Sequence, residues 1–295
     1  MRAELLAALA ALCWATGSVL SAHAASQMGA FAFSRWRLFF AMCMLWAIAA
    51  VWGHGRGLDM QAIGVLVLSG LIGIFVGDSA LFACMNRLGP RRCGILFATH
   101  ALFSALLAWP LLGETLWGWT LVGSALLVSG VMVAIAWGRR ADESHRWEDT
   151  RGTLAVGVAL GLLAALCQAV ATLMIKPLMS TGVDAVSASA IRTTTAFVAH
   201  LVLLWGGVGQ SRLLQPLTTR LVLATGASGV VAMALGMTLI LVALRTGQAN
   251  LVSIMSSISP VLLLPLLWMI YRRRPALGAW VGSAMAVMGT VLILV

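Results

Sequence analysis

Charged residues are scarce in this 295-residue chain: they make up 9% of it, and only nine are acidic. A soluble domain carries about 25% charged residues, so the composition excludes an ordinary water-soluble fold. Hydrophobic residues account for 61% of the sequence. The length suits about ten membrane spans of roughly 20 apolar residues each.

The net charge of +10 comes mainly from Arg at the ends of apolar segments, and the one basic run is at 272–274. In a membrane protein such charges orient the chain and contact lipid headgroups. We therefore expect a lipid bilayer as partner and no nucleic acid.

Motifs for metals, cofactors and ATP hydrolysis are also missing. The five Cys form no CxxC pair and lie within or beside apolar runs, so neither a metal site nor a disulfide is expected. The phosphate-binding pattern GxxxxGK[ST] does not occur. Membrane-embedded transferases need clustered acids or a nucleophile beside a base, and no two acids share a helical turn inside an apolar run. We expect no cofactor and no catalysis, with a membrane-embedded enzyme as the alternative.

Long apolar runs dominate the rest of the chain. Continuous apolarity without alternation favours helices over a β-barrel, and only these two structures satisfy the backbone in hydrocarbon. The expected fold is an all-α integral membrane protein with ten transmembrane helices. The predicted spans are 3–22, 30–52, 62–85, 91–112, 116–137, 153–177, 184–206, 219–243, 248–270 and 276–294.

Two boundaries need comment. Residues 87–91, with the sequence Arg-Leu-Gly-Pro-Arg, predict a tight turn between the third and fourth spans. The first run ends in Ala-His-Ala at 22–24, which is also typical of a secretory signal. We favour a retained first helix because this run matches the sixth one.

The two halves of the chain repeat. Residues 10–15 match 164–169 at an offset of 154, Arg37 matches Arg192 at 155, and 122–125 match 281–284 at 159. We therefore divide the chain into a repeat at 1–137, a polar linker at 138–152 and a second repeat at 153–295. Five helices per repeat is an odd number, so the second repeat should be inverted, as in many secondary transporters.

Several of these residues also resemble a known family. Trp14, Arg37, the Leu-Leu-Gly-Glu-Thr-Leu segment at 111–116, and Gly123 with Gly130 are similar to the EamA-type ten-helix branch of the drug/metabolite transporter superfamily. The resemblance covers nearly the whole chain, and YddG-type amino-acid exporters supply the functional analogy. It implies export of small metabolites, often amino acids, by alternating access.

The second half departs from the family pattern. Arg residues at 272–274 stand where a second Glu is expected, and Gln168 is the mate of Trp14. Substrate contacts should therefore be asymmetric. We expect a bacterial inner-membrane carrier for a small-molecule substrate. Two fused halves would let it function as a monomer.

Charged residues inside a span are costly and so suggest function. Asp78 is the only acid well inside a predicted span, and His100 lies near the middle of another. We predict that they contact a polar substrate. The alternatives are a packing hydrogen bond from Asp78 to Ser79 or to backbone, and a neutral His100 with a buried partner.

Other polar and aromatic residues are candidates for the same cavity. Small hydroxyls can line a wet cavity or pack helices closely, and Trp14 could stack on a substrate or fill space. The full predicted substrate-binding set is Asp78, Ser79, Phe82, Thr99, His100, Trp14, Gln168, Ser256, Ser257 and Ser259.

Three further charges have a coupling or a structural role. Glu114 could couple protons, although an acid close to a helix start is more often stabilised by free N–H groups. Arg37 and Arg192 could bind a carboxylate bidentately. We favour snorkelling to headgroups or pinning of a helix end for both arginines.

Loop charges and the resemblance predict opposite orientations. Basic residues concentrate in the loops on the side away from the termini, which places both termini outside the cytoplasm, whereas the resemblance implies termini inside. The substrate could also be a drug or another small molecule, and a passive channel is a further alternative.

Overall fold

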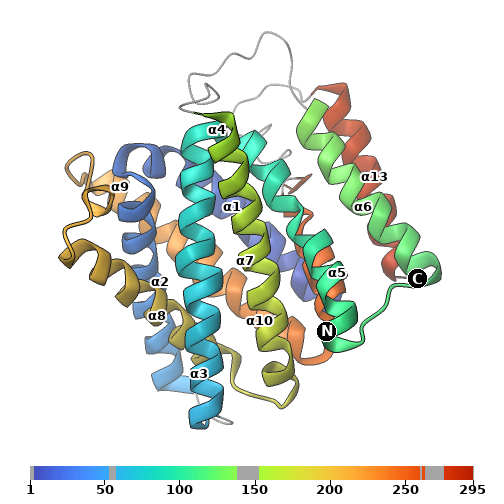
Figure 1. Cartoon of the computed structure of the whole chain (residues 1–295), viewed down its shortest axis with the longest axis horizontal. Coiled ribbons are helices and arrows are strands. Elements are labelled where there is room, and N and C mark those ends of the chain that lie inside the picture. The colour runs from blue at the N-terminus through green and yellow to red at the C-terminus, as the bar shows by residue number, and fades with distance from the viewer. Residues whose placement is uncertain (1–2, 53–57, 138–152, 260, 263–275, 295) are drawn as a thin grey trace.

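The structure, a computed structural model, describes residues 3–52, 58–137, 153–259, 261–262 and 276–294. Regular secondary structure in these ranges is entirely helical, which confirms the predicted all-α class, and the helices form a bundle (Figure 1). The predicted linker at 138–152 lies outside the described residues. So does most of the second part of the predicted ninth span, at 263–270.

The helices follow the predicted order. The first half forms α1 (Ala3–Met28), α2 (Ala30–Trp52), α3 (Met60–Ser69), the π-helix η1 (Gly70–Asp78), α4 (Ser79–Ala98), α5 (His100–Leu112) and α6 (Gly118–Trp137). The second half forms α7 (Leu154–Ser180), α8 (Ala185–Trp205), the short 3-10 helix η2 (Gly209–Ser211), α9 (Thr219–Ser228), the π-helix η3 (Gly229–Gly236), α10 (Met237–Thr246), α11 (Ala249–Ser256) and α13 (Leu277–Leu294).

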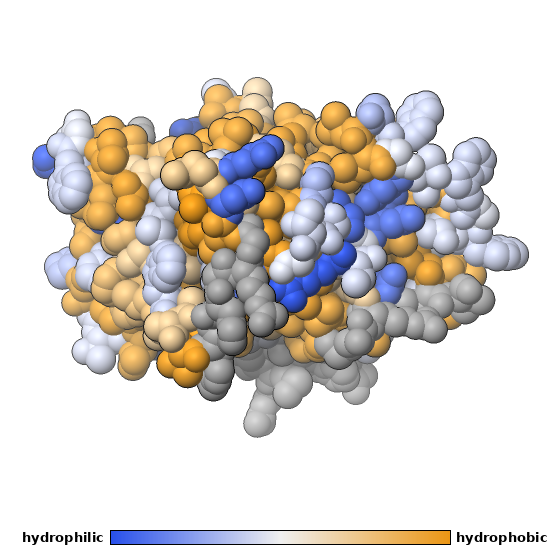
Figure 2. All heavy atoms as spheres, turned by 90° about the horizontal axis from the view of Figure 1, so that it is seen from below, coloured by the Kyte–Doolittle hydropathy of each residue, from blue (hydrophilic) through white to orange (hydrophobic). Residues whose placement is uncertain are grey.

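Seven helical segments of the described chain are long and apolar enough to cross a membrane. They are Ala3–Ser21, Ala30–Val51, Met60–Leu88, Arg92–Leu112, Leu154–Ser180, Ala185–Trp205 and Thr219–Thr246. Two shorter apolar helices, Gly118–Val133 and Leu277–Ile293, occupy the predicted fifth and tenth spans. In the end-on view of Figure 2, hydrophobic residues predominate and hydrophilic ones form smaller patches.

The third helix of each half begins and changes in the same way. Asp59 caps α3 by accepting a hydrogen bond from the Ala62 N–H at 2.7 Å, and Thr218 caps α9 from the Leu221 N–H at 3.3 Å. Side-chain oxygens at this position satisfy N–H groups that lack a partner within the helix. Each helix then passes into a π-helical segment. Such segments are rare in proteins overall, and those that occur often lie at functional sites. The two caps are 159 residues apart, as are the starts of η1 and η3.

The chain reverses within α4, at the predicted turn. Cys93 Sγ donates to the Leu81 carbonyl oxygen at 3.3 Å, although twelve residues of straight helix would separate them by about 18 Å. The residues at 87–91 are nevertheless helical by backbone hydrogen bonding. The prediction of a reversal here is confirmed, and the apolar segments divide at the same place, after Leu88.

Helices of one half pack on helices of the other. α2 packs on α8 and η3, α8 on η1, and α1 on η3 and α10. The helices α6 and α13 lie side by side at one edge of the bundle (Figure 1). A Cβ added at Gly130 would lie 2.7 Å from the Gly282 carbonyl oxygen, so these two backbones approach as closely as glycine allows.

Candidate functional site

The π-helices bring the two halves together at two equivalent arginines. Gly229, which begins η3, lies against the backbone carbonyl of Arg37 on α2. Gly70, which begins η1, lies against the carbonyl of Arg192 on α8, where an added Cβ would be 2.7 Å from the oxygen. The contacts are reciprocal, because each half presents its glycine to the arginine helix of the other.

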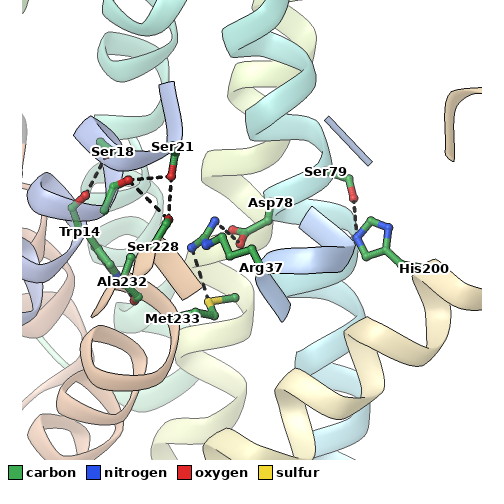
Figure 3. A network of polar contacts seen from close by, with 11 residues as sticks. Trp14, Ser18, Ser21, Arg37, Asp78, Ser79, His200, Ser228, Ala232 and Met233 are labelled. Atoms are coloured by element: carbon green, nitrogen blue, oxygen red, sulfur yellow. Dashed lines mark hydrogen bonds and ion pairs between the residues drawn. The ribbon is translucent and has the colours of Figure 1, made fainter. Parts of the chain in front are cut away.

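The Arg37 side chain lies within a polar network (Figure 3). Its Nη1 is 3.5 Å from Asp78 Oδ2, and its Nη2 is 3.6 Å from Met233 Sδ. The guanidinium carbon lies 5.2 Å from the centre of the Phe82 ring, a cation–π contact. The Arg37 and Asp78 side chains are only 10% and 19% exposed, so this ion pair is largely withdrawn from solvent.

Arg192 is buried beside the same acid. The residue is 2% exposed, and its Nη1 lies 3.2 Å from Met237 Sδ. Asp78 interacts electrostatically with Arg192 as well as with Arg37. The Arg192 Nε has no hydrogen-bond partner among the described residues. We call Arg37, Asp78 and Arg192 the central charge cluster; it contains two cations and one anion.

The prediction that both arginines snorkel to headgroups or pin a helix end is wrong. Their exposed fractions of 8% and 2% place them inside the protein. A buried guanidinium requires a partner, because removing the charged group from water costs on the order of several kcal/mol. Asp78 on η1 supplies this partner, and a contact between such distant segments leaves no periodic signal in the sequence.

Asp78 does not bond to Ser79, its predicted structural partner. Ser79 Oγ instead lies 3.4 Å from His200 Nε2, on the other side of the helix (Figure 3). His200 is fully buried between the rings of Phe31 and Phe75, at centroid distances of 5.9 and 5.0 Å. His200 is not among the predicted site residues, although a histidine inside an apolar run is a usable signal.

Trp14 joins α1 to the π-helix of the second half. Its indole Nε1–H donates to the Ala232 carbonyl oxygen at 3.0 Å (Figure 3). A Cβ added at Gly236 would lie 2.9 Å from the Trp14 ring, so the indole lies flush against η3. Its repeat mate Gln168 is buried on α7, with an exposed fraction of 9%.

His100 lies apart from the central charge cluster. It begins α5 and is 2% exposed, with the Phe97 ring 5.1 Å away. Thr99, at the junction of α4 and α5, donates its hydroxyl to the Leu96 carbonyl oxygen at 2.5 Å. No contact that the structure describes joins His100 to Asp78, so the two predicted partners belong to separate places.

The predicted serines pack near α5. Ser104 Oγ donates to Ser253 Oγ at 2.9 Å, which links α5 to α11. Ser256 and Ser257 turn their hydroxyls onto backbone carbonyls of α11, at 2.9 and 2.7 Å. Ser259 is partly exposed. The Ser256 and Ser257 bonds lie within α11, so a wet cavity and close helix packing both stay predictions for these serines.

Glu114 caps a helix of the other half. Its Oε1 and Oε2 accept hydrogen bonds from the Ala249 and Asn250 N–H groups at 2.8 and 3.0 Å. These groups open α11, so the prediction that Glu114 binds free helix N–H groups has the right chemistry. The helix is α11, however, and not the adjacent α6.

A bundle of apolar membrane-length helices around buried charges is typical of multi-pass membrane transport proteins. The sequence profile of the EamA-like transporter family matches residues 1–136 and 155–295, so the chain belongs to this family.

One curated relative is an uncharacterized transporter from Archaeoglobus fulgidus, 25% identical over 169 residues. The match covers 57% of this chain and 56% of the relative, so the chain spans little more than half of that protein's length. A solved crystal structure superposes with a TM-score of 0.78 at 18% identity, over 99% of this chain and 96% of its own. That likeness shows the fold alone.

Proposed function

We propose that this protein exports small metabolites, with amino acids as the first class to test, across a bacterial inner membrane by alternating access. The comparisons support a transporter that handles small molecules in a membrane. The amino-acid substrate, by analogy with YddG-type exporters, and the alternating-access mechanism are our proposal.

The reciprocal packing supports an inverted repeat as the basis of this mechanism. Gly17 lies against Ala232 of η3, and a Cβ added at Gly73 of η1 would lie 2.5 Å from Ala171 Cβ. These pairs exchange places between the halves at the offsets of 154 and 159 residues. Two halves that pack on each other equivalently can form two similar states, one open to each side of the membrane.

The central charge cluster is the observation that carries the proposal. Buried ionisable residues in membrane proteins are costly and mark substrate or ion pathways. Ser18 on α1 donates its hydroxyl to the Trp14 carbonyl oxygen. It is exposed, although it lies on the side of α1 roughly opposite Leu5, Leu9 and Leu12, whose exposed fractions of 46%, 44% and 42% mark the lipid side. We propose that the substrate binds beside this cluster, within reach of Trp14 and Phe82.

The test is uptake and counterflow of a labelled amino-acid panel in proteoliposomes, each at two pH gradients. Saturable, exchangeable movement would support a carrier, and its pH dependence would reveal proton coupling. Linear flux at all concentrations would instead identify a channel. Turnover of a substrate by the detergent-purified protein would support the alternative of a membrane-embedded enzyme.

Site variants then separate the two polar regions. We expect Asp78→Asn and His100→Ala to lower transport per folded protein, with Gly64→Ala as an exposed control that has no neighbour within 4 Å of its added Cβ. Loss only in Asp78→Asn would restrict the site to the central charge cluster. Wild-type rates in both variants would remove both residues from the substrate site.

A further inference from the structure

We propose that the substrate binds through a carboxylate to the Arg192 guanidinium, and that a substrate ammonium group is not required. This inference rests on the proposed function and specifies its substrate class as carboxylate monoanions, such as 2-oxo acids, in addition to amino acids. It follows from charge balance, from the lack of acceptors around Arg192, and from an asymmetry between the halves.

The central charge cluster has a surplus positive charge. Arg37 and Arg192 are always protonated in proteins, and Asp78 is the one acid that interacts with either of them within the described chain. Asp78 is already engaged by both cations and is therefore poorly placed to bind a substrate ammonium. An added monoanion would make the cluster neutral.

The surplus charge belongs to Arg192. Arg37 has the direct ion pair with Asp78 at 3.5 Å, whereas the described contact of Arg192 Nη1 is the Met237 thioether at 3.2 Å. Sulfur is a weak acceptor, and a guanidinium carries five N–H donors in a fork that matches a carboxylate. Both arginines have an Nε without a partner among the described residues and both contact a thioether, so the direct ion pair of Arg37 with Asp78 is what distinguishes them.

The halves differ at the position that would balance Arg192. Met237 follows Asp78 by 159 residues, the offset that also relates Gly70 to Gly229. Arg37 therefore faces an acid where Arg192 faces a methionine. The second half keeps the cation and lacks its counter-ion, so the bound substrate can supply it.

Gly73 of η1 lies between Ala171 of α7 and the Arg192 side chain, so it lets η1 pack closely on both. A Cβ added at Gly73 of η1 would lie 3.4 Å from Arg192 Nη2. The Asp78 side chain, on the same π-helix, is 19% exposed, so the cluster is not fully enclosed. In this proposal a small planar carboxylate approaches Arg192 from the side of Asp78.

The experiment compares three probes that share one aromatic ring: phenylalanine, phenylpyruvate and phenethylamine. Each is tested for thermal stabilisation of the purified protein and as a competitor in counterflow. We expect phenylpyruvate to bind at least as well as phenylalanine, and phenethylamine to be about tenfold weaker or worse, because it lacks the charge-assisted hydrogen bonds to Arg192. Equal binding of phenethylamine and phenylpyruvate would overturn the proposal.

The variants Met237→Glu and Met237→Gln form a matched pair that differs by one charge. A glutamate here would neutralise Arg192, so we expect Met237→Glu to keep or raise thermal stability while weakening phenylpyruvate binding about tenfold or more relative to Met237→Gln. Equal phenylpyruvate binding by two folded variants would overturn the proposal. Arg192→Lys, which keeps the charge, should bind phenylpyruvate more tightly than Arg192→Gln.

Two further results distinguish carboxylate binding from halide binding and from amino-acid export. If chloride alone gives the same stabilisation and abolishes that of phenylpyruvate, the site binds halide and the carboxylate assignment fails. If no amino acid moves in proteoliposomes but phenylpyruvate binding follows the charge at residue 237, the inference stands and the exporter proposal fails. If amino acids are transported but neither their transport nor phenylpyruvate binding depends on the charge at residue 237, the exporter proposal stands and this inference fails.

Discussion

Asp78 ends the π-helix η1 and holds the Arg37 side chain of α2 at 3.5 Å, inside a chain that consists largely of apolar helices. The pair lies where the two halves meet, and Arg192 from the other half interacts with the same carboxylate. The structure therefore concentrates these buried charges where helices of the two halves meet, which is where we propose that the substrate binds.

The first prediction compares how much stability is lost when different members of the central charge cluster are replaced. Asp78→Asn leaves two buried cations without a counter-ion and should cost about 3–5 kcal/mol of stability. Arg37→Met leaves Asp78 with Arg192, a balanced pair, and should cost less. Thermal unfolding in detergent would measure both variants.

The double variant Arg37→Met with Asp78→Asn provides the control. It contains one buried cation, so it should be more stable than Asp78→Asn alone. A double variant that is less stable than either single variant would mean that packing, and not charge balance, determines the cost.

The second prediction concerns the reciprocal glycines. Gly70→Ala and Gly229→Ala would each press a methyl group onto an arginine carbonyl and should cost about 1–3 kcal/mol through overpacking. Gly64 lies in the same span as Gly70, but a Cβ added there has open space around it. Gly64→Ala should therefore be neutral or stabilising by up to about 1 kcal/mol. Equal melting temperatures for all three variants would contradict the close approach.

The third prediction separates two roles of Glu114. Glu114→Gln can still accept one hydrogen bond from the start of α11, whereas Glu114→Ala accepts none and should lose about 1–2 kcal/mol. If capping is the whole role, the pH profile of transport by Glu114→Gln will match that of the wild type. A flattened profile in this variant would restore proton coupling as its function.

The fourth prediction concerns the Trp14 indole. Trp14→Phe keeps most of the packing against Gly236 but leaves the Ala232 carbonyl oxygen without this donor, which should cost about 0.5–1.5 kcal/mol. Trp109→Phe is the matched control, because Trp109 on α5 is 69% exposed. Similar losses in both variants would show that the hydrogen bond to η3 contributes nothing specific.

Much of the helix pattern was predictable because each span is a local run of apolar residues. The chain reversal near Leu88 was also predictable, since Gly and Pro adjoin there in the sequence. The helical backbone through that reversal was not, and neither were the π segments, because a shift in hydrogen-bond register leaves the hydrophobic pattern unchanged.

The site was only partly predictable, for a different reason. Asp78 could be singled out by its charge, but its pairing with Arg37 depends on how two helices cross, which one sequence does not specify. The same limit applies to Glu114, which caps a helix 135 residues further along the chain. The position of His200 inside an apolar run is visible in the sequence, but its contacts with Phe31 and Phe75 depend on how the helices pack.

If the substrate supplies the counter-ion of Arg192, as we propose, its transport has an electrical consequence for the cell. In many cells the membrane potential is negative inside. Moving one elementary charge across such a membrane changes its free energy by about 2.3 kcal/mol per 100 mV. A carrier that releases its cargo as a monoanion would therefore be driven outward by voltage alone. Such an exporter would need neither ATP nor a proton gradient, and the resting potential of the membrane would set how far it can empty the cytoplasm.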